Sequence, residues 1–257
     1  MTSKLHLDRR GPVGLVELNR PEVLNAIDGE LNQALLEAMR QLEDDGQTKV
    51  VVFAGRGERA FSAGADLKFM RTLSGATLRR FIESTWTTLQ AISQSPLISI
   101  AALHGHVLGG GAELALACDL RVTGRNLSFG FPEMTLGSLP GSGGMQRLPE
   151  VLGRARALEL LALGTRLDAP TALAWGLVNR MAEEASSVDE LALSLAGELG
   201  QRPAESLRYA KVAMRMDRRP DLASAFHGLV SSVRQADPSY RGQTDRFQGG
   251  AQQGNGP

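Results

Sequence analysis

Short runs of β-branched residues alternate with longer amphipathic stretches along the first half of this chain of 257 residues. The runs that predict strands lie at 49–54, 97–102 and 119–122, and the stretches that predict helices lie at 31–45, 65–71, 78–92 and 110–117. Two strands of one sheet that are joined through a helix run parallel, with a right-handed crossover. The alternation therefore predicts an α/β fold with a parallel sheet and helices outside it.

Both ends of the chain depart from this alternation. Leu5–Leu7 and Val13–Leu18 flank Arg10-Gly11-Pro12, which predicts a β-hairpin near the N-terminus. From 143 to about 234 most of the chain has helical periodicity, and this region is expected to cover the core or to build a subunit interface. Residues 248–257 are mostly Gly and Gln and are expected to be disordered.

Composition narrows the classes of protein to which the chain can belong. Its 28 basic and 28 acidic residues cancel, which argues against a general role at nucleic acids or membrane surfaces, since those roles need a basic excess. The single cysteine, Cys118, allows no intramolecular disulfide, suits a reducing compartment and is expected in the core. The start of the chain lacks a signal-peptide stretch and no window approaches the ~18 apolar residues of a spanning helix, so the expected location is the cytoplasm.

Two glutamates stand out because each follows a loop marked by glycine or proline. Glu113 ends the run Leu108-Gly109-Gly110-Gly111-Ala112-Glu113, and Glu133 follows Phe131-Pro132, with Gly141-Ser142-Gly143-Gly144 after it. Glycines at the start of a helix leave backbone N–H groups free and let a ligand approach closely. Two carboxyls beside such donors can move protons next to a developing oxyanion, so the pattern indicates chemistry on a carbonyl or thioester.

The donors of such an oxyanion hole are predicted to be the backbone N–H groups of Ala65 and Gly110, each at a helix start. Gly64 permits the sharp turn before Ala65. An alternative of similar weight is that these glycines only allow close packing of helix and strand. Likewise, Glu113 can be a first-turn carboxylate that stabilises its own helix, and Glu133 an exposed loop carboxylate.

Two further motifs are weaker. Ala60-Phe61-Ser62-Ala63-Gly64 has the outline of a nucleophile elbow with alanine in the first position, but no later Asp and His with a supporting signature accompany it. His104 and His106 can face the same way on an extended segment, as metal ligands do, but a third ligand at suitable spacing is missing. Packing or loop hydrogen bonds are favoured for both histidines, and no metal site is predicted.

Five segments, taken in order, resemble the enoyl-CoA hydratase/isomerase (crotonase) superfamily. The resemblance runs from Val13 to Val178, roughly two-thirds of the chain. Each segment alone is a weak signal, and their shared order is what makes the resemblance specific. The segments are Leu18–Ala26, Ala60–Leu67, His104–Leu114, Pro132–Gly137 and Leu139–Leu148.

The resemblance implies a crotonase-like spiral of ββα turns over 1–195, a helical C-terminal region over 196–247 that builds trimers or hexamers or closes the site, and a tail at 248–257. It also implies an acyl-CoA thioester as substrate, with no separate cofactor, and a thioester carbonyl held by Ala65 and Gly110. The residues that it places around CoA are Val23, Ala26, Ala63, Gly64, Asp66, Leu67 and Gly141. Candidates for the acyl pocket are Phe69, Met70 and Trp86, with Phe81 as either pocket or ordinary core.

By the same analogy, the two glutamates hold one water molecule between them. Glu113 acts as base when the water adds to Cβ, and Glu133 delivers a proton to Cα. The expected activity is therefore hydration of a trans-2-enoyl-CoA to a 3-hydroxyacyl-CoA. The alternatives are an enoyl-CoA isomerase with one shuttling glutamate and a non-catalytic scaffold that binds CoA esters.

Four features depart from the family's usual pattern. Met145 stands where Thr is common, His104 replaces a frequent Asn, and Glu22 occupies a position where some members carry a Lys for a CoA phosphate. The segment Asp237–Phe247 only faintly resembles the family's closing segment. These departures leave open the acyl chain that is preferred and the residues that bind the CoA phosphates.

Overall fold

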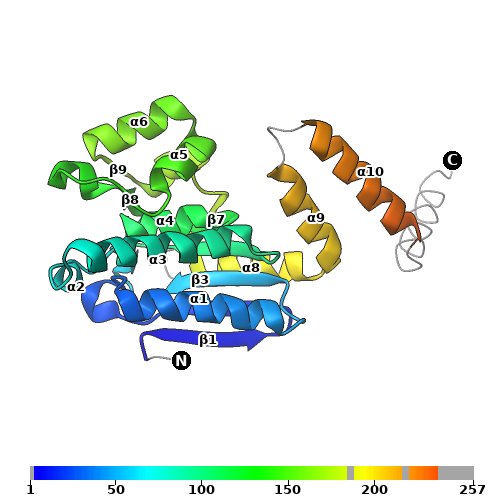
Figure 1. Cartoon of the computed structure of the whole chain (residues 1–257), viewed down its shortest axis with the longest axis horizontal. Helices are drawn as coiled ribbons and strands as arrows, with labels where there is room; N and C mark the ends of the chain where they lie inside the picture. The colour runs from blue at the N-terminus through cyan, green and yellow to red at the C-terminus, as the bar shows by residue number, and fades with distance from the viewer. Residues whose placement is uncertain (1–2, 184–187, 216–219, 237–257) are drawn as a thin grey trace. The chain divides into compact units, whose positions relative to one another are not determined.

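The computed structural model describes residues 3–183, 188–215 and 220–236 (Figure 1). The chain divides after Ala204 into two compact units, which are described separately. The expected boundary between residues 195 and 196 falls inside helix α8 (Val188–Gly200), which belongs to the first unit. The closing segment Asp237–Phe247 and the tail at 248–257 lie outside the described residues.

The first unit contains a six-stranded sheet in the order β1-β2-β3-β5-β7-β10. The strands β1 (Leu5–Arg10) and β2 (Val13–Leu18) form the predicted antiparallel hairpin. The other neighbours run parallel, as the alternation of strands and helices predicted. These parallel strands are β3 (Val50–Gly55), β5 (Ile98–Leu103), β7 (Leu120–Thr123) and β10 (Arg180–Met181).

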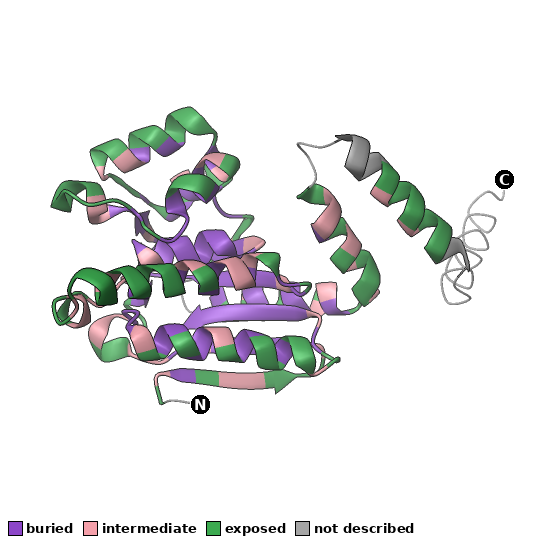
Figure 2. Ribbon diagram, viewed as in Figure 1, coloured by how far each residue is buried: buried purple, intermediate pink, exposed green. Residues whose placement is uncertain are grey.

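Helices cover both faces of this sheet, and the buried residues gather in its strands and on the helix faces that meet them (Figure 2). On one face α1 (Gly29–Asp44) packs against the sheet and against α3 (Gly75–Gln94). Helix α1 begins where the Asp28 side chain accepts a hydrogen bond from the N–H of Leu31, and its buried leucines each contribute about 1.5–3 kcal/mol by leaving water. On the other face α8 covers β2, β3, β5 and β7.

A second, smaller sheet has the order β4-β6-β8-β9, and the sequence did not predict it. Three of its strands run parallel, so their carboxyl ends meet at one edge. They lead into 63–66, 109–113 and 131–133, which are three of the segments with predicted functional residues. The strands are β4 (Ala60–Ser62), β6 (His106–Leu108), β8 (Ser128–Gly130) and the antiparallel β9 (Arg166–Leu167).

Short helices complete the first unit. Helix α4 has the predicted bounds (Gly110–Ala117), whereas α2 is shorter than predicted (Leu67–Met70), because Asp66 has extended backbone and caps it. Cys118, at the end of α4, is buried as predicted. The remaining elements are η1 (Pro21–Val23), η2 (Pro132–Leu136), α5 (Gly144–Leu152), α6 (Arg154–Leu163) and α7 (Ala169–Ala174).

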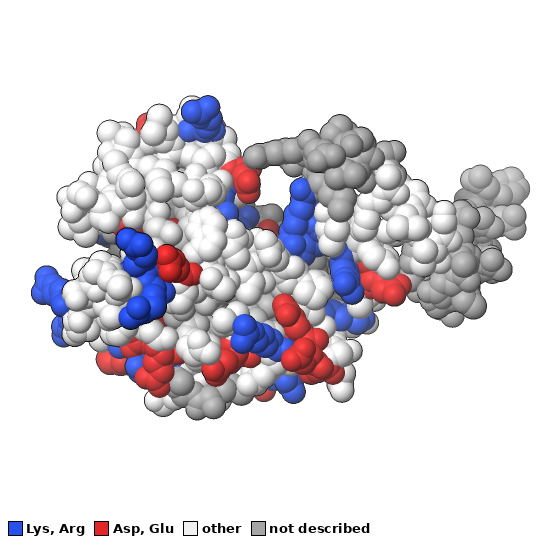
Figure 3. All heavy atoms as spheres, viewed as in Figure 1, with Lys and Arg blue, Asp and Glu red and all other residues white. Residues whose placement is uncertain are grey.

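The second unit contains α9 (Ala204–Met214) from Glu205 onward and α10 (Pro220–Ala236). Tyr209 and Phe226 pack edge to face, with ring centres 6.0 Å apart, and thereby join the two helices. None of the helices in the described residues is long and apolar enough to cross a membrane. On the face of the first unit shown in Figure 3, basic and acidic side chains are interspersed.

Candidate active site

The segments that follow β4 and β6 meet backbone to backbone. Gly64 has a φ of +95°, and a Cβ atom there would lie 2.6 Å from the Leu108 carbonyl oxygen and 2.9 Å from the Gly110 nitrogen. A Cβ atom on Gly110 would lie 3.5 Å from the nitrogen of Ala65. The two predicted oxyanion donors therefore lie close together. Among the described residues, neither of these N–H groups has a hydrogen-bond acceptor.

The loop before α1 fixes the position of the segment after β4. The Ser62 hydroxyl donates to the Asn25 carbonyl at 2.8 Å, and the Asn25 amide donates to the Ala60 carbonyl at 2.9 Å. The Ile27 N–H donates to the Gly64 carbonyl at 2.8 Å. Ser62 is fully buried, so its hydroxyl serves this structure, and the geometry gives no support to a nucleophile elbow.

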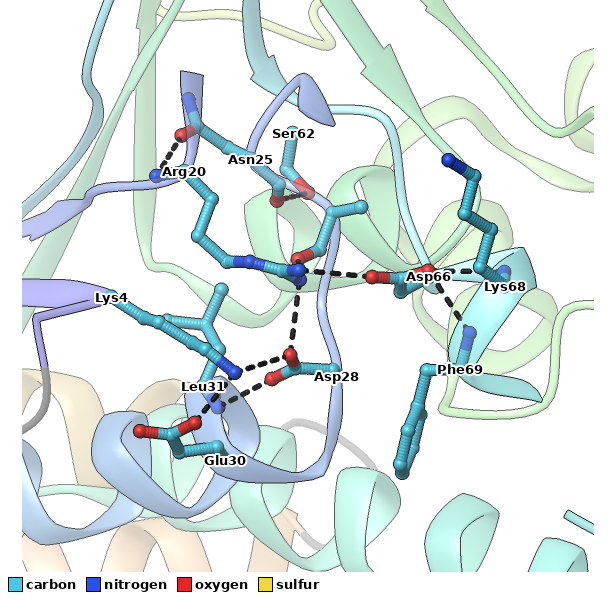
Figure 4. Close-up of polar contacts among 11 residues, drawn as sticks. Lys4, Arg20, Asn25, Asp28, Glu30, Leu31, Ser62, Asp66, Lys68 and Phe69 are labelled. Carbon is cyan, nitrogen blue, oxygen red and sulfur yellow. Dashed lines mark hydrogen bonds and ion pairs between the residues drawn. The ribbon is translucent and has the colours of Figure 1, made fainter. Parts of the chain in front are cut away.

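A network of charged groups extends this connection to α2 (Figure 4). The Arg20 guanidinium contacts Asp66 at 3.0 Å and Asp28 at 3.2 Å, and Lys4 contacts Asp28 at 2.7 Å. Asp66 also accepts hydrogen bonds from Lys68 and Phe69, the first-turn N–H groups of α2. Partial burial alone would raise the pKa of Asp66, but the Phe69 N–H and Arg20 lower it. Its carboxylate thus positions the loop that carries Ala65.

Glu113 projects from the first turn of α4 toward the start of α5. Its side chain is buried, and Oε1 accepts hydrogen bonds from the N–H groups of Ser142 at 2.7 Å and Gly144 at 2.9 Å. The carboxylate therefore contacts the start of α5, where a helix binds anions, and does not cap its own helix. Burial raises the pKa of Glu113 to about 7. The charge of Glu133 adds to this shift, and the two N–H groups oppose it.

Glu133 lies in η2, directly after β8. A Cβ atom on Gly109 would lie 2.6 Å from Glu133 Oε1, so this carboxyl lies against the residue that precedes the donor Gly110. Its Oε2 is buried and has no hydrogen-bond partner among the described residues. Burial raises the pKa of Glu133 as well. A buried polar atom needs a partner, so this oxygen is a candidate contact for a ligand.

All the residues predicted to surround CoA except Gly141 lie in two adjacent segments. The segment with Val23 and Ala26 is joined to the segment with Ala63, Gly64, Asp66 and Leu67, because the Ala63 N–H donates to the Leu24 carbonyl at 2.9 Å. Leu67 is exposed. Gly141 lies elsewhere, beside Ile82 of α3, where an added Cβ atom would lie 3.2 Å from Ile82 Cγ2.

The candidates for the acyl pocket lie on α2 and α3. Phe69 packs edge to face on Phe81, with ring centres 5.2 Å apart, and Phe81 is buried. Met70 ends α2 and is half-buried. Trp86 lies under the guanidinium of Arg147, which is 5.9 Å from the ring centre. These contacts join α2, α3 and α5, and the acyl pocket stays a prediction.

Three features of the site were missed from the sequence. They are the N–H donors of Ser142 and Gly144, the guanidinium of Arg147 and the ion pairs of Arg20. The glycine run before α5 was a sequence signal for the Ser142 and Gly144 donors, because free N–H groups at a helix start bind carboxylates. Arg147 and Arg20 gave no such signal, since their partners are far away in the sequence.

The two histidines lie near β6 without forming a cluster of ligands. His104 is buried, and burial lowers its pKa. In the described part of the chain, no group of three or more His, Cys, Asp and Glu side chains could hold a metal ion.

Comparisons with known proteins agree with this architecture. The sequence model described as enoyl-CoA hydratase/isomerase matches residues 8–237. Mouse enoyl-CoA hydratase domain-containing protein 2, mitochondrial, is 40% identical over 218 residues, which are 83% of this chain and 74% of that protein. Carnitinyl-CoA dehydratase from Salmonella paratyphi A is 35% identical over 249 residues, which are 97% and 94% of the two chains.

The crystal structure of an enoyl-CoA hydratase from Bacillus anthracis superposes with a TM-score of 0.91 at 31% identity and covers 95% of this chain and 96% of its own. The predicted crotonase-like fold is confirmed by this match. The chain therefore belongs to the enoyl-CoA hydratase/isomerase family.

Proposed function

We propose that this protein adds water across the double bond of a trans-2-enoyl-CoA and gives a 3-hydroxyacyl-CoA. The observation that supports this best is the arrangement around the first turn of α4. Two buried or half-buried carboxyls, Glu113 and Glu133, lie there with the free N–H groups of Ala65 and Gly110. Hydration of an enoyl thioester needs a base, an acid and donors for an enolate oxygen, and this set provides all of them.

The thioester carbonyl accepts hydrogen bonds from Ala65 and Gly110 in this scheme. When water adds to Cβ, negative charge develops on that oxygen. The two N–H groups are held in place before the reaction, because the backbone at Gly64 packs closely against Leu108 and Gly110, so they stabilise the charge without rearrangement. One such donor typically contributes about 3 kcal/mol to the transition state.

Glu113 is the base that takes the proton of the attacking water. Its Oε1 is held by Ser142 and Gly144, and no hydrogen bond within the described residues engages Oε2, which is left to contact the water. A pKa of about 7 lets the carboxyl accept and release a proton near neutral pH. Glu133, whose pKa is also raised, delivers a proton to Cα, and a proton exchanged between the two carboxyls restores the starting state.

The relatives support chemistry of this kind. The name carnitinyl-CoA dehydratase describes removal of water from a CoA ester, and a site that removes water also adds it, because both directions share one transition state. The scheme uses the CoA ester and water and needs no further cofactor. Assembly into trimers or hexamers stays a prediction, which light scattering of the full chain would test.

The test of this proposal is the loss of enoyl-thioester absorbance when the purified protein meets crotonyl-CoA. Steady loss that scales with protein concentration and stops at the hydration equilibrium is expected. No loss, with binding of the CoA ester intact, would contradict hydration of short chains. A 3-enoyl-CoA and longer 2-enoyl-CoAs would then separate an isomerase from a hydratase with another chain preference.

The rate should depend on pH because both carboxyls have raised pKa values. Glu113 must be deprotonated to act as base, so kcat/KM is expected to rise with pH through about 7. Glu133 must carry a proton to act as acid, and burial raises its pKa, so kcat/KM is expected to pass through a maximum and to fall once both carboxyls have ionised. Initial rates from about pH 5 to about pH 9 at constant ionic strength measure both limbs. A rising limb near 4.5, the ordinary value for Glu, would argue against Glu113 as the base.

A further inference from the structure

Arg147 is a buried cation beside the candidate site, and the scheme above does not use it. It lies in α5 and only 8% of its surface is exposed. The ion pairs found in the described part of the chain do not include it. Its hydrogen bonds go to neutral groups, from Nη1 to the Ser142 carbonyl at 2.9 Å and from Nη2 to Gln90 Oε1 at 3.2 Å.

The same loop connects Arg147 to Glu113. Ser142 donates its N–H to Glu113 Oε1 and accepts the Arg147 guanidinium at its carbonyl. Between Ser142 and Gly144, Gly143 has a φ of +107°, and a Cβ atom there would collide with Arg147 Nη1. The guanidinium therefore packs against this loop. The N–H groups of the same loop donate to the Glu113 carboxylate.

The α3 helix holds the guanidinium from the other side. Gln90 accepts its second hydrogen bond, and the Trp86 ring lies 5.9 Å from its central carbon. An aromatic face attracts a cation at that distance. Both contacts fix the planar group without neutralising it, so its positive charge remains to act on the surroundings.

A buried guanidinium without a paired carboxylate is costly, because the charge loses its hydration. Burial accordingly lowers the pKa of Arg147, and the charge of Glu113 is the first of the opposing influences, followed by Glu150 and Cys118. The charged groups that act on Glu113 are Glu133 of η2 and Arg147 of α5. Arg147 is thus the cation that opposes the effect of Glu133 on the candidate base.

We propose that Arg147 is a positioning residue for the hydration reaction. It holds the loop at 142–144 against Glu113 and keeps a positive charge near the Glu113 carboxyl. This inference rests on the proposed function, in which Glu113 is the base. Trp86, which was predicted to line the acyl pocket, and Gln90 hold the guanidinium in this arrangement. Arg147 acts on Glu113 through Ser142 and through its charge.

Three variants test this proposal. Arg147→Met removes the charge and both hydrogen bonds, Arg147→Lys keeps the charge without the forked donors, and Gln90→Met removes one acceptor and keeps the charge. The matched control is Arg156→Met in α6, whose guanidinium also lies over an indole ring, 4.9 Å from the centre of Trp175. Among the hydrogen bonds of the described residues, none joins Arg156 to the 142–144 loop.

The expected result is a change in kcat with little change in KM. For Arg147→Met, kcat should fall at least about tenfold, and the rising limb of the pH profile should move up by roughly one unit, because a nearby cation no longer favours the charged form of Glu113. In Arg147→Lys the rising limb of the pH profile should lie close to its wild-type position, but kcat should stay below the wild-type value. Gln90→Met should lower kcat a few-fold and leave the limb in place, and Arg156→Met should change neither.

Infrared titration of the Glu113 carboxyl band, assigned by its loss in Glu113→Gln, gives a readout that needs no turnover. In Arg147→Met the band should titrate at higher pH than in the wild type. If the wild-type protein hydrates neither crotonyl-CoA nor longer 2-enoyl-CoAs, the proposed function fails, and the infrared shift still decides whether Arg147 acts on Glu113. If Arg147→Met does not fold, Arg147→Lys and Gln90→Met decide. An unmoved limb and band in Arg147→Met, or unchanged kcat in the other two variants, would overturn the proposal.

Discussion

Replacement of Glu113 by Gln is expected to lower kcat for hydration by about 10²–10⁴-fold, because the amide cannot take a proton from water. The shape of the side chain is kept, and the amide oxygen can still accept from Ser142 and Gly144. The measurement is kcat and KM on crotonyl-CoA, with KM expected to change little. Glu83→Gln, an exposed position on α3, is the matched control and should retain full activity.

Glu133→Gln separates the two possible mechanisms. Hydration with two carboxyls requires that this variant loses activity as Glu113→Gln does. If only Glu113→Gln is inactive, one shuttling carboxyl suffices and the isomerase alternative gains support. Full activity in Glu113→Gln would remove that carboxyl from the chemistry altogether.

The same Glu113→Gln variant should be more stable than the wild type at alkaline pH. Folding raises the pKa of Glu113 from 4.5 to about 7, so the folded state binds its proton more tightly than the unfolded state. The stability that this provides is present below pH 4.5 and is lost as pH rises through about 7. The two pKa values differ by 7 − 4.5, which corresponds to on the order of 3 kcal/mol in the free energy of unfolding at alkaline pH. The Gln variant avoids this loss because its side chain does not ionise. Urea unfolding at several pH values measures this, and a stability difference that does not change with pH would contradict it.

Gly64→Ala is expected to lower kcat by about 10²–10³-fold, the usual effect of losing one oxyanion donor. The added Cβ atom would lie 2.9 Å from the Gly110 nitrogen and 2.6 Å from the Leu108 oxygen, so the two loops must move apart. The Ala65 and Gly110 N–H groups then no longer converge. The measurement is kcat on crotonyl-CoA, together with thermal unfolding.

Gly176→Ala is a close control for this change. Gly176 also has a positive φ, +78°, but a Cβ atom there has no atom within 4 Å. Both variants carry the backbone strain of alanine in a left-handed conformation, roughly 1–2 kcal/mol. When activity is expressed per amount of folded protein, only Gly64→Ala should be less active than the wild type. Equal losses in both variants would show that strain alone is responsible and that the oxyanion donors do not lie at this contact.

The larger sheet and its helices could be predicted because their signals extend over many residues. Helix α1 has a buried stripe at Leu31, Leu35 and Leu42, and β3 is apolar along its whole length. The second sheet was missed because β4, β6 and β8 have three residues each, too few to show a period of two. Its edge nevertheless brings 65, 110 and 133 together, so the sequence could identify these residues without explaining why they meet.

The partners of the two glutamates could not be predicted in the same way. Glycine runs identified Gly110 and the start of α5 as sources of free N–H groups, but not which carboxylate binds there. Glu113 lies 29 residues from Ser142, and Arg20 lies 46 residues from Asp66, so both contacts depend on the fold. Arg147 lies in an amphipathic helix, where a sequence pattern gives no reason to expect a buried cation.

The mass of the product formed from crotonyl-CoA in water labelled with heavy oxygen tests the central claim most directly. If Glu113 and Glu133 add water across the double bond, the wild-type protein gives a 3-hydroxyacyl-CoA that contains one heavy oxygen, and neither Gln variant does so at a comparable rate. If the ester binds but is recovered without the label, or only its double bond moves, the protein is not a hydratase for this substrate and the two-carboxyl account is wrong for it.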